Sequence, residues 1–281
     1  MPAIGVFDSG VGGLTVLRAL QQAMPQESFI YLGDTARLPY GTKSAETVAR
    51  YALQSADALV HRGVKALVVA CNTASAAALD VLTVRYRHLP VIGVIEPGAR
   101  AACAASRSGR IVVLATEGTV RGRSYQRAIA ALRPEAQVTA VACQLFVALA
   151  EEGWTSGAVV ESTIDRYLRP VFAAAMDGSA PDRASPDTIV LGCTHFPVLR
   201  AAIAQSLGSS VMLLDSAATT AVATRERLQR EGLLGVGGES ATVGEPGVRF
   251  LATDSVARFA GVGSRFLGRE IRESEVELID L

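Results

Sequence analysis

Two cysteines occupy similar places in the sequence, each directly after a short apolar run. Cys71 follows KALVVA (65–70), Cys193 follows DTIVLG (187–192), and polar residues and a helix-like run come after both. The thiolate of cysteine is a base and a nucleophile, and the N-terminus of a helix stabilises it, so we expect the pKa of such a thiol to fall. Cys103, within AACAAS, is instead expected to be a small buried residue.

Two such thiols, one in each half of the chain, suit one kind of reaction. If they face each other across a cleft, one can remove a proton from one face of a carbon while the other returns a proton to the opposite face. A hydrolase needs only one nucleophile with a His or an Asp. The pair therefore predicts a racemase or an epimerase, in which His195 beside Cys193 could orient or tune that thiol.

Asp8 opens the glycine-rich stretch DSGVGG (8–13), which follows the first predicted strand. A carboxylate at this position can accept a hydrogen bond from a substrate ammonium group or hold the proton of a thiol. The alternative is that Asp8 only caps the following helix. The dinucleotide fingerprint G-x-G-x-x-G is incomplete, because Thr15 occupies its third glycine position. We expect instead a turn whose free N–H groups bind a smaller anion, such as a carboxylate.

The elements that must position these residues alternate between strand and helix. Continuous apolar runs predict strands that are covered on both faces, at 3–7, 28–33, 65–70, 90–95, 110–115, 137–142, 187–192, 210–215 and 247–253. Helical patterns lie between them, for example at 14–24, 44–62 and 156–175. This alternation predicts an α/β fold with mainly parallel sheets.

Two halves of the chain resemble each other. ALVVACNTAS (66–75) is similar to TIVLGCTHFP (188–197), and AIGVFDSGVG (3–12) is more weakly similar to RIVVLATEGT (110–119), which aligns Ser9 with Thr116. The order of strand, hydroxyl, strand and cysteine therefore occurs twice. We expect a duplicated α/β unit.

The overall composition narrows the class of protein. The 281 residues include 27 Lys and Arg and 27 Asp and Glu, and this balance argues against a general nucleic-acid or anionic-membrane binder. We expect no secretory signal and no membrane span, which needs about 20 mostly apolar residues. The four cysteines form no C-x-x-C, which disfavours a zinc cluster or a disulfide framework. We expect the chain in the cytoplasm, where thiols stay reduced.

Motifs along nearly the whole chain resemble those of the aspartate/glutamate racemase superfamily, and within it the glutamate racemases. In the family's order they are DSGVGGLTV (8–16), PYGTKS (39–44), ACNTASA (70–76), GTV (118–120), CQLFVALAEEG (143–153) and GCTHFP (192–197). The resemblance implies two similar α/β domains, related by pseudo-two-fold symmetry, with the active site in the cleft between them. The expected first domain comprises residues 1–97 plus 208–281, and the second comprises residues 98–207.

The resemblance also implies an activity and the residues that carry it. It implies racemisation of L- to D-glutamate with no cofactor and no metal, which supplies D-glutamate for peptidoglycan. Cys71 is expected to remove the α-proton from D-glutamate and Cys193 from L-glutamate. Polar residues that assist the thiols are matched by Asp8, Glu152 and His195. Substrate contacts are matched by Asp8, Ser9, Pro39, Tyr40, Gly41, Asn72, Thr73, Thr116, Thr119, Thr194 and His195.

Three alternatives stay open at this point. The same scaffold could racemise aspartate or another amino acid, and a kinetic comparison of glutamate with aspartate separates these two activities. A non-catalytic ligand-binding or partner-binding protein is disfavoured because both cysteines are present, and a nucleotide-dependent oxidoreductase because the third glycine is missing. We expect a homodimer with a small-molecule substrate and with no direct nucleic-acid or membrane partner.

Overall fold

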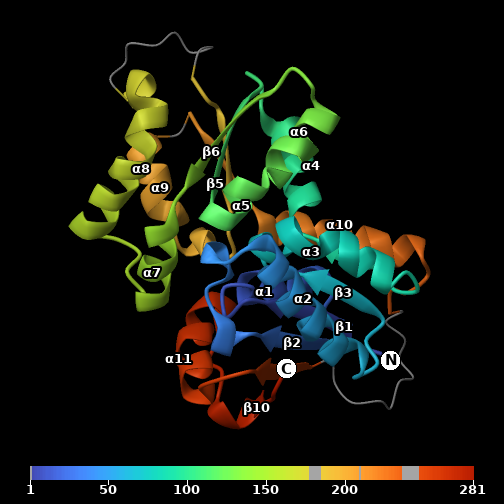
Figure 1. Cartoon of the computed structure of the whole chain (residues 1–281). Helices are drawn as coiled ribbons and strands as arrows, with labels where there is room; N and C mark the ends of the chain where they lie inside the picture. The colour runs from blue at the N-terminus through green and yellow to red at the C-terminus, as the bar shows by residue number, and fades with distance from the viewer. Residues whose placement is uncertain (1, 177–184, 209, 236–246) are drawn as a thin grey trace.

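Two parallel sheets form the framework of the chain in a computed structural model, which describes residues 2–176, 185–208, 210–235 and 247–281 (Figure 1). The strands are β1 (Ile4–Asp8), β2 (Phe29–Gly33), β3 (Ala66–Val69), β4 (Val91–Gly93), β5 (Arg110–Ala115), β6 (Gln137–Ala142), β7 (Thr188–Gly192), β8 (Met212–Asp215), β9 (Val248–Ala252) and β10 (Val276–Leu278). The larger sheet has the order β10-β9-β2-β1-β3-β4, and the smaller has the order β6-β5-β7-β8. Every strand pair in both sheets is parallel.

Helices alternate with these strands, so the predicted α/β class with mainly parallel sheets is confirmed. The α-helices are α1 (Leu14–Ala23), α2 (Ala45–Val60), α3 (Asn72–Arg85), α4 (Ile95–Ala105), α5 (Glu117–Gly122), α6 (Ser124–Leu132), α7 (Gln144–Glu152), α8 (Ala158–Met176), α9 (Arg200–Leu207), α10 (Ser216–Arg230) and α11 (Val256–Leu267). Short 3-10 helices are η1 (Thr35–Arg37), η2 (Tyr40–Thr42), η3 (Phe196–Leu199) and η4 (Glu273–Glu275). None of the helices in the described ranges has both the length and the hydrophobicity needed to cross a membrane.

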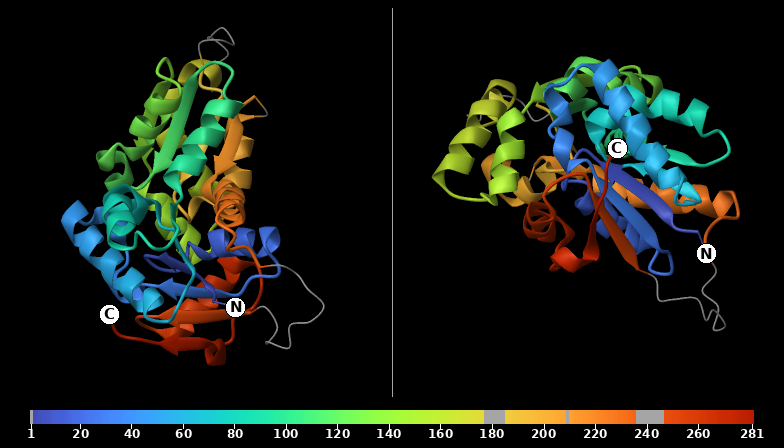
Figure 2. Two further views of the ribbon diagram at one scale, coloured as in Figure 1. Left: turned by 90° about the vertical axis from the view of Figure 1, so that its right-hand side faces the viewer. Right: turned by 60° about the horizontal axis from the view of Figure 1, so that its bottom comes forward.

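The strand order supports the predicted duplication. The arrangement β2-β1-β3-β4 in the larger sheet is repeated as β6-β5-β7-β8 in the smaller one. In this correspondence Cys71 follows β3 and Cys193 follows the equivalent strand β7. Strands β9 and β10 extend only the larger sheet, so both ends of the chain lie beside it (Figure 2).

The membership of β8 differs from the expected domain boundary at residue 208. Strand β8 pairs with β7 from Thr188↔Met212 to Leu191↔Asp215, so the smaller sheet continues to Asp215. The chain passes to the smaller sheet through α4 and returns through α10, and these two helices pack against each other. The chain therefore leaves the smaller sheet after β8, which completes the repeated four-strand order, and α10 leads it back to the larger sheet.

Successive side chains of each strand point to opposite faces of the sheet, so buried apolar residues lie on both faces. Phe7 and Val69 belong to a buried cluster that packs under α2 and α3. Val6 and Val68 point to the opposite face and share a second cluster with Val113 of the smaller sheet. The two sheets are thus joined by a continuous apolar core, which holds the carboxyl ends of their strands in a defined relation.

Candidate active site

The carboxyl ends of equivalent strands from the two sheets meet at a small cavity of about 20 Å³. It is lined by Ser9, Leu38, Pro39, Tyr40, Gly41, Cys71, Asn72, Thr73, Thr116, Val147, Cys193, Thr194 and His195. Both strand-end cysteines are in this set, although 122 positions separate them in the sequence. Asp8, Thr119 and Glu152, which the sequence also predicts, are not in the lining, and sequence reasoning did not anticipate Leu38 and Val147.

Cys71 caps the N-terminus of α3, as predicted, but its electrostatic environment differs from the expected one. Its Sγ accepts a hydrogen bond from the backbone N–H of Ala74 at 3.4 Å and lies 3.7 Å from Ser9 Oγ. Burial, reinforced by the charge of Asp8, nevertheless raises the pKa of the thiol to about 12. The expectation of a lowered pKa is therefore wrong for Cys71, because desolvation outweighs the helix terminus.

Asp8 is fully buried at the end of β1 and faces both halves of the site. Its Oδ2 accepts from the N–H of Gly10 at 3.0 Å, and its Oδ1 accepts from Thr194 Oγ1 at 3.4 Å. Burial raises the pKa of Asp8, although the charge of His195 and several backbone N–H groups act in the opposite direction. The N–H of Gly10, which the sequence predicts as free for an external anion, is used by the chain's own carboxylate.

Close neighbours in both domains leave no room for a Cβ at two positions of this turn. A Cβ on Gly12 would lie 2.6 Å from Thr194 Oγ1, and one on Gly13 would lie 2.6 Å from the Cβ of Asp8. Non-bonded heavy atoms other than hydrogen-bond partners do not approach so closely. Gly12 thus allows the backbone to approach the second domain, and Gly13 allows it to approach Asp8, which explains these two glycines without a nucleotide.

Cys193 lies in a different local structure from Cys71. It is followed by the 3-10 helix η3 and only then by α9, so the predicted immediate helix N-terminus is absent from this part of the described chain. Its Sγ lies 3.9 Å from Nδ1 of His195, and its carbonyl oxygen accepts from the N–H of Phe196 at 3.1 Å. The imidazole of His195 therefore replaces the helix terminus as the polar partner of this thiol.

His195 is held on several sides. Its Nε2 lies 3.1 Å from Oε1 of Glu151, and its ring packs at 72° against that of Phe266 with the centroids 5.2 Å apart. Burial alone would lower the pKa of His195, but the contacts with Cys193 and Glu151 and the charge of Asp8 raise it to about 10. At neutral pH the ring is an imidazolium that can donate from both nitrogens.

The carboxylate beside His195 is Glu151, whereas the sequence predicts Glu152. Glu152 is exposed at the C-terminal end of α7. Glu151 has a side chain only 12 % exposed, and its Oε2 lies 3.0 Å from Nη2 of Arg258. Burial would raise the pKa of Glu151, but His195 and Arg258 lower it, so this carboxylate stays charged. Adjacent residues of a helix point in different directions, so only one of the two carboxylates can face His195. The sequence motif does not show which of them does.

Three predicted threonines form one hydroxyl cluster across the two domains. Thr73 Oγ1 lies 2.8 Å from Thr116 Oγ1 and 3.3 Å from Thr119 Oγ1, and the last two are 3.1 Å apart. Thr119 is buried behind the two threonines that line the cavity. A Cβ on Gly41 would lie 2.7 Å from that of Thr116, so glycine lets the 39–44 loop approach the cluster.

Two further predicted residues are fixed by buried polar partners. Tyr40 donates a short hydrogen bond to Asp34, and burial together with that carboxylate raises the pKa of the phenol. Asn72 accepts from the hydroxyl of Tyr125 at 2.8 Å and donates to Ser216 Oγ at 3.4 Å. Tyr125 was not anticipated by sequence reasoning, because it lies in the first turn of α6 and not directly after a strand.

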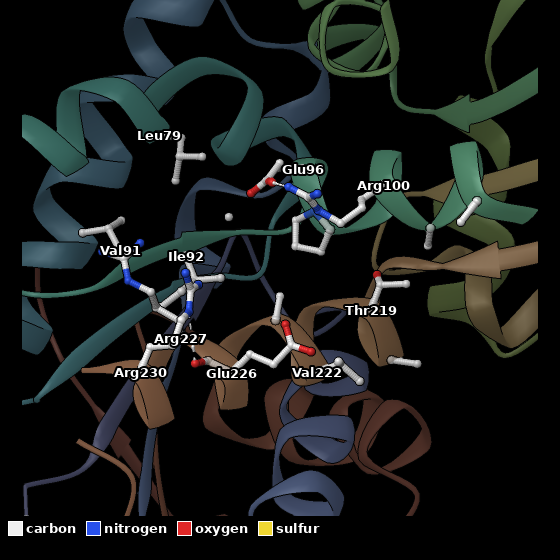
Figure 3. Close-up of a pocket in the computed structure, with 16 residues that line it drawn as sticks. Leu79, Val91, Ile92, Glu96, Arg100, Thr219, Val222, Glu226, Arg227 and Arg230 are labelled. Carbon is white, nitrogen blue, oxygen red and sulfur yellow. Dashed lines mark hydrogen bonds and ion pairs between the residues drawn. The ribbon is translucent and has the colours of Figure 1, made fainter. Parts of the chain in front are cut away.

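A larger cavity of about 770 Å³ lies elsewhere, where α3, β4 and α4 face α10 (Figure 3). Arg100, Arg227 and Arg230 line it together with Glu96 and Glu226. The close-up shows these side chains converging from both sides of the cavity, but none of the four cysteines lines it. Size alone therefore does not identify the reactive site. In the described residues, no group of three His, Cys, Asp or Glu side chains could hold a metal ion.

Comparison with known proteins gives a consistent result. The model of the Asp/Glu/Hydantoin racemase family matches residues 4–224. A glutamate racemase of Geobacter metallireducens is 50 % identical over 269 residues, covering 96 % of this chain and 94 % of that protein. A crystal structure of a glutamate racemase isoform from Bacillus anthracis superposes with a TM-score of 0.88 at 37 % identity, covering 100 % of this chain and 98 % of that one. The Francisella tularensis glutamate racemase in complex with D-glutamate has a TM-score of 0.86 at 35 % identity, with 99 % and 97 % covered.

Proposed function

The chain belongs to the Asp/Glu/Hydantoin racemase family, and on that premise we propose that it interconverts L- and D-glutamate without a cofactor, using Cys71 and Cys193 as its two bases. The observation that carries the proposal is that both thiols line one cavity and come from equivalent strands of different domains. The substrate is inferred from relatives named glutamate racemase that match this chain over almost its whole length.

The proposed reaction moves one proton on each face of the α-carbon. From L-glutamate, the Cys193 thiolate removes the α-proton, so that the C–H bond breaks, an S–H bond forms and the electron pair stays on carbon. The Cys71 thiol then gives its proton to the opposite face, which forms the new C–H bond and leaves a thiolate. From D-glutamate the two cysteines exchange roles, and neither direction needs an oxidant or a co-substrate.

The charges around the thiols favour one starting form. With its pKa raised to about 12, Cys71 is a neutral thiol at neutral pH and is ready to donate a proton. His195 is an imidazolium at this pH, and its Nδ1, 3.9 Å from Cys193 Sγ, can stabilise a thiolate there. These contacts suit the first step proposed for L-glutamate, in which Cys193 is the base and Cys71 is the acid. Asp8 assists from behind the cavity by keeping Cys71 protonated and by accepting from Thr194.

The remaining lining residues suit an amino acid with two carboxylates. Hydroxyl groups of Ser9, Thr73, Thr116 and Thr194 and the amide of Asn72 provide donors that can bind carboxylates without adding a net charge. Pro39, Tyr40 and Gly41 also line the cavity. A cavity of about 20 Å³ holds little more than one water molecule, so the residues that line it must rearrange to admit glutamate.

We place this reaction upstream of peptidoglycan synthesis, as the source of D-glutamate, by analogy with the family. A cytoplasmic location would keep the two thiols reduced, and all four cysteines of the chain are free. A homodimer remains our expectation for the assembly.

The direct test is incubation of enzyme dialysed against EDTA with pure L-glutamate and no added cofactor, followed by chiral chromatography. We expect equal amounts of the two enantiomers at equilibrium, and a much slower reaction with L-aspartate under the same conditions. Activity that vanished on dialysis and returned with a metal or with pyridoxal phosphate would overturn the two-thiol proposal. Faster turnover of aspartate would overturn the choice of substrate.

A further inference from the structure

A relay of three charged side chains leads from α11 of the first domain to one of the two thiols. Nη2 of Arg258 lies 3.0 Å from Oε2 of Glu151, and Oε1 of Glu151 lies 3.1 Å from Nε2 of His195. Nδ1 of the same ring lies 3.9 Å from Sγ of Cys193. Both oxygens of Glu151 are therefore used, one on each side, and the carboxylate is fixed between two cations.

This fixation determines which way the imidazole points. A carboxylate held only by His195 could rotate or turn towards solvent, whereas the second contact with Arg258 restrains it. The ring itself packs against Phe266, which also belongs to α11. With Nε2 bound to Glu151, the remaining N–H of the imidazolium is directed at Cys193.

We propose that Arg258 is a positioning residue for proton transfer at Cys193, and that it acts through Glu151 and His195. This inference rests on the proposed racemase function. Arg258 has a side chain 59 % exposed and does not line the catalytic cavity, so it is not expected to touch the substrate. Because Arg258 belongs to the first domain and Cys193 follows a strand of the second, the relay is complete only when the domains are closed.

The relay should serve only one of the two thiols. The polar contacts of Cys71 are the hydroxyl of Ser9 and the N–H of Ala74. Neither contact involves Arg258, Glu151 or His195. Loss of Arg258 should therefore slow proton transfer at Cys193 and leave transfer at Cys71 unchanged, so the isotope effects measured with the two enantiomers should change in opposite directions.

The test measures both directions of racemisation in Arg258→Ala and Arg258→Lys, with Arg265→Ala as the matched control. Arg265 lies on the same helix against Gly153 at the end of α7, so its removal also disturbs the contact between these helices but leaves Glu151 in place. The readouts are kcat, KM and the primary isotope effect on kcat/KM with substrate deuterated at the α-carbon.

We expect kcat/KM of Arg258→Ala to fall about five- to tenfold, as for loss of a partly exposed ion pair that supports an active-site group. The kcat/KM values for L-to-D and D-to-L racemisation must fall by the same factor, because the two enantiomers have the same free energy. The isotope effects should diverge. The effect with L-glutamate should rise, because deprotonation by Cys193 becomes more rate-limiting, and the effect with D-glutamate should fall. Arg258→Lys should recover most of the loss, and Arg265→Ala should behave as wild type.

Each other outcome overturns the inference. Unchanged kinetics in Arg258→Ala would show that the relay has no role in catalysis. An equal rise of both KM values with unchanged isotope effects, shared by Arg265→Ala, would show that Arg258 only ties the domains together. A wild-type enzyme that does not racemise glutamate would instead refute the proposed function, and this result is obtained before any variant is compared.

Discussion

Nε2 of His195 lies 3.1 Å from Oε1 of Glu151, a residue 44 positions earlier in the chain and on a different element. The contact buries a charged pair, since the two side chains are 3 % and 12 % exposed. Removing one partner of a buried ion pair lowers the stability far more than removing one partner of an exposed pair, because the other charge is left buried and uncompensated. The activity should therefore depend strongly on this one carboxylate.

The adjacent residues Glu151 and Glu152 provide a matched test. We expect Glu151→Gln to lower kcat/KM about 10- to 100-fold, since it removes the charge that keeps His195 protonated and oriented. Glu152→Gln changes an exposed side chain and should retain activity within about twofold. Steady-state racemisation of both variants checks this assignment, and a larger loss in Glu152→Gln than in Glu151→Gln would return the role to Glu152.

The close approach at Gly12 leads to a second prediction. A Cβ there would lie 2.6 Å from Thr194 Oγ1 and would also overlap the ring of His195. Gly12→Ala should therefore displace the loop that carries Cys193 and lower kcat at least about tenfold, with a loss of stability of roughly 1–3 kcal/mol from overpacking.

The control for this change is Gly261→Ala, on α11. A Cβ at Gly261 meets no atom within 4 Å, and alanine in a helix is favoured over glycine by about 1 kcal/mol. This variant should be as active as wild type and slightly more stable in urea denaturation. Equal activity of the Gly12→Ala and Gly261→Ala variants would show that the two domains do not need this approach.

Stability should depend on pH through His195. Its pKa is raised from 6.5 to about 10 in the folded state. Below pH 6.5 both folded and unfolded chains hold the proton, so the stabilisation is fully present. Between pH 6.5 and 10 the folded state keeps a proton that the unfolded state has lost, so the free energy of unfolding must decrease as pH rises.

The measurement is urea denaturation between pH 6.5 and 8, below the pKa of about 9 at which the Cys71 thiol of the unfolded chain begins to lose its proton. Over this interval the wild-type free energy of unfolding should fall by more than about 1 kcal/mol beyond that of His195→Gln. Parallel pH profiles for the two proteins would show that His195 is not held as an imidazolium.

The fold and most of the lining were predictable from sequence for a simple reason. Continuous apolar runs mark buried parallel strands, and residues directly after such strands gather at one edge of a sheet. Ser9, Cys71, Thr116 and Cys193 all follow strands that were predicted, and all of them line the cavity. Strand β10 was not predicted, because only Val276 of its three residues is buried at the sheet edge.

The rest depends on three-dimensional contacts that sequence patterns do not contain. Desolvation of Cys71 is set by how completely the two domains close over it, and this reversed the expected direction of its pKa shift. Arg258 is one of many exposed arginines, and only its approach to Glu151 distinguishes it. The expected domain boundary at residue 208 could not take account of the pairing of β8 with β7, because that pairing is a contact between separate segments of the chain.

The two thiols should be individually indispensable. Cys71→Ala and Cys193→Ala should each abolish interconversion of the enantiomers, because inversion requires a proton acceptor on one face and a donor on the other. Both variants should fold, since each removes a single small side chain at a cavity wall. Chiral chromatography together with a thermal denaturation curve checks both statements. A folded single variant that racemises at close to the wild-type rate would exclude that cysteine.

The most direct test of the two-thiol account is racemisation of L-glutamate in deuterated water, stopped early and analysed by chiral separation with mass spectrometry. The proton returned to the substrate comes from the thiol opposite the one that removed the original proton, and that thiol has exchanged with solvent. We expect D-glutamate that carries deuterium at the α-carbon, while the remaining L-glutamate carries little. D-glutamate that retains the original proton, or equal labelling of both enantiomers from the start, would indicate a single base and contradict the account.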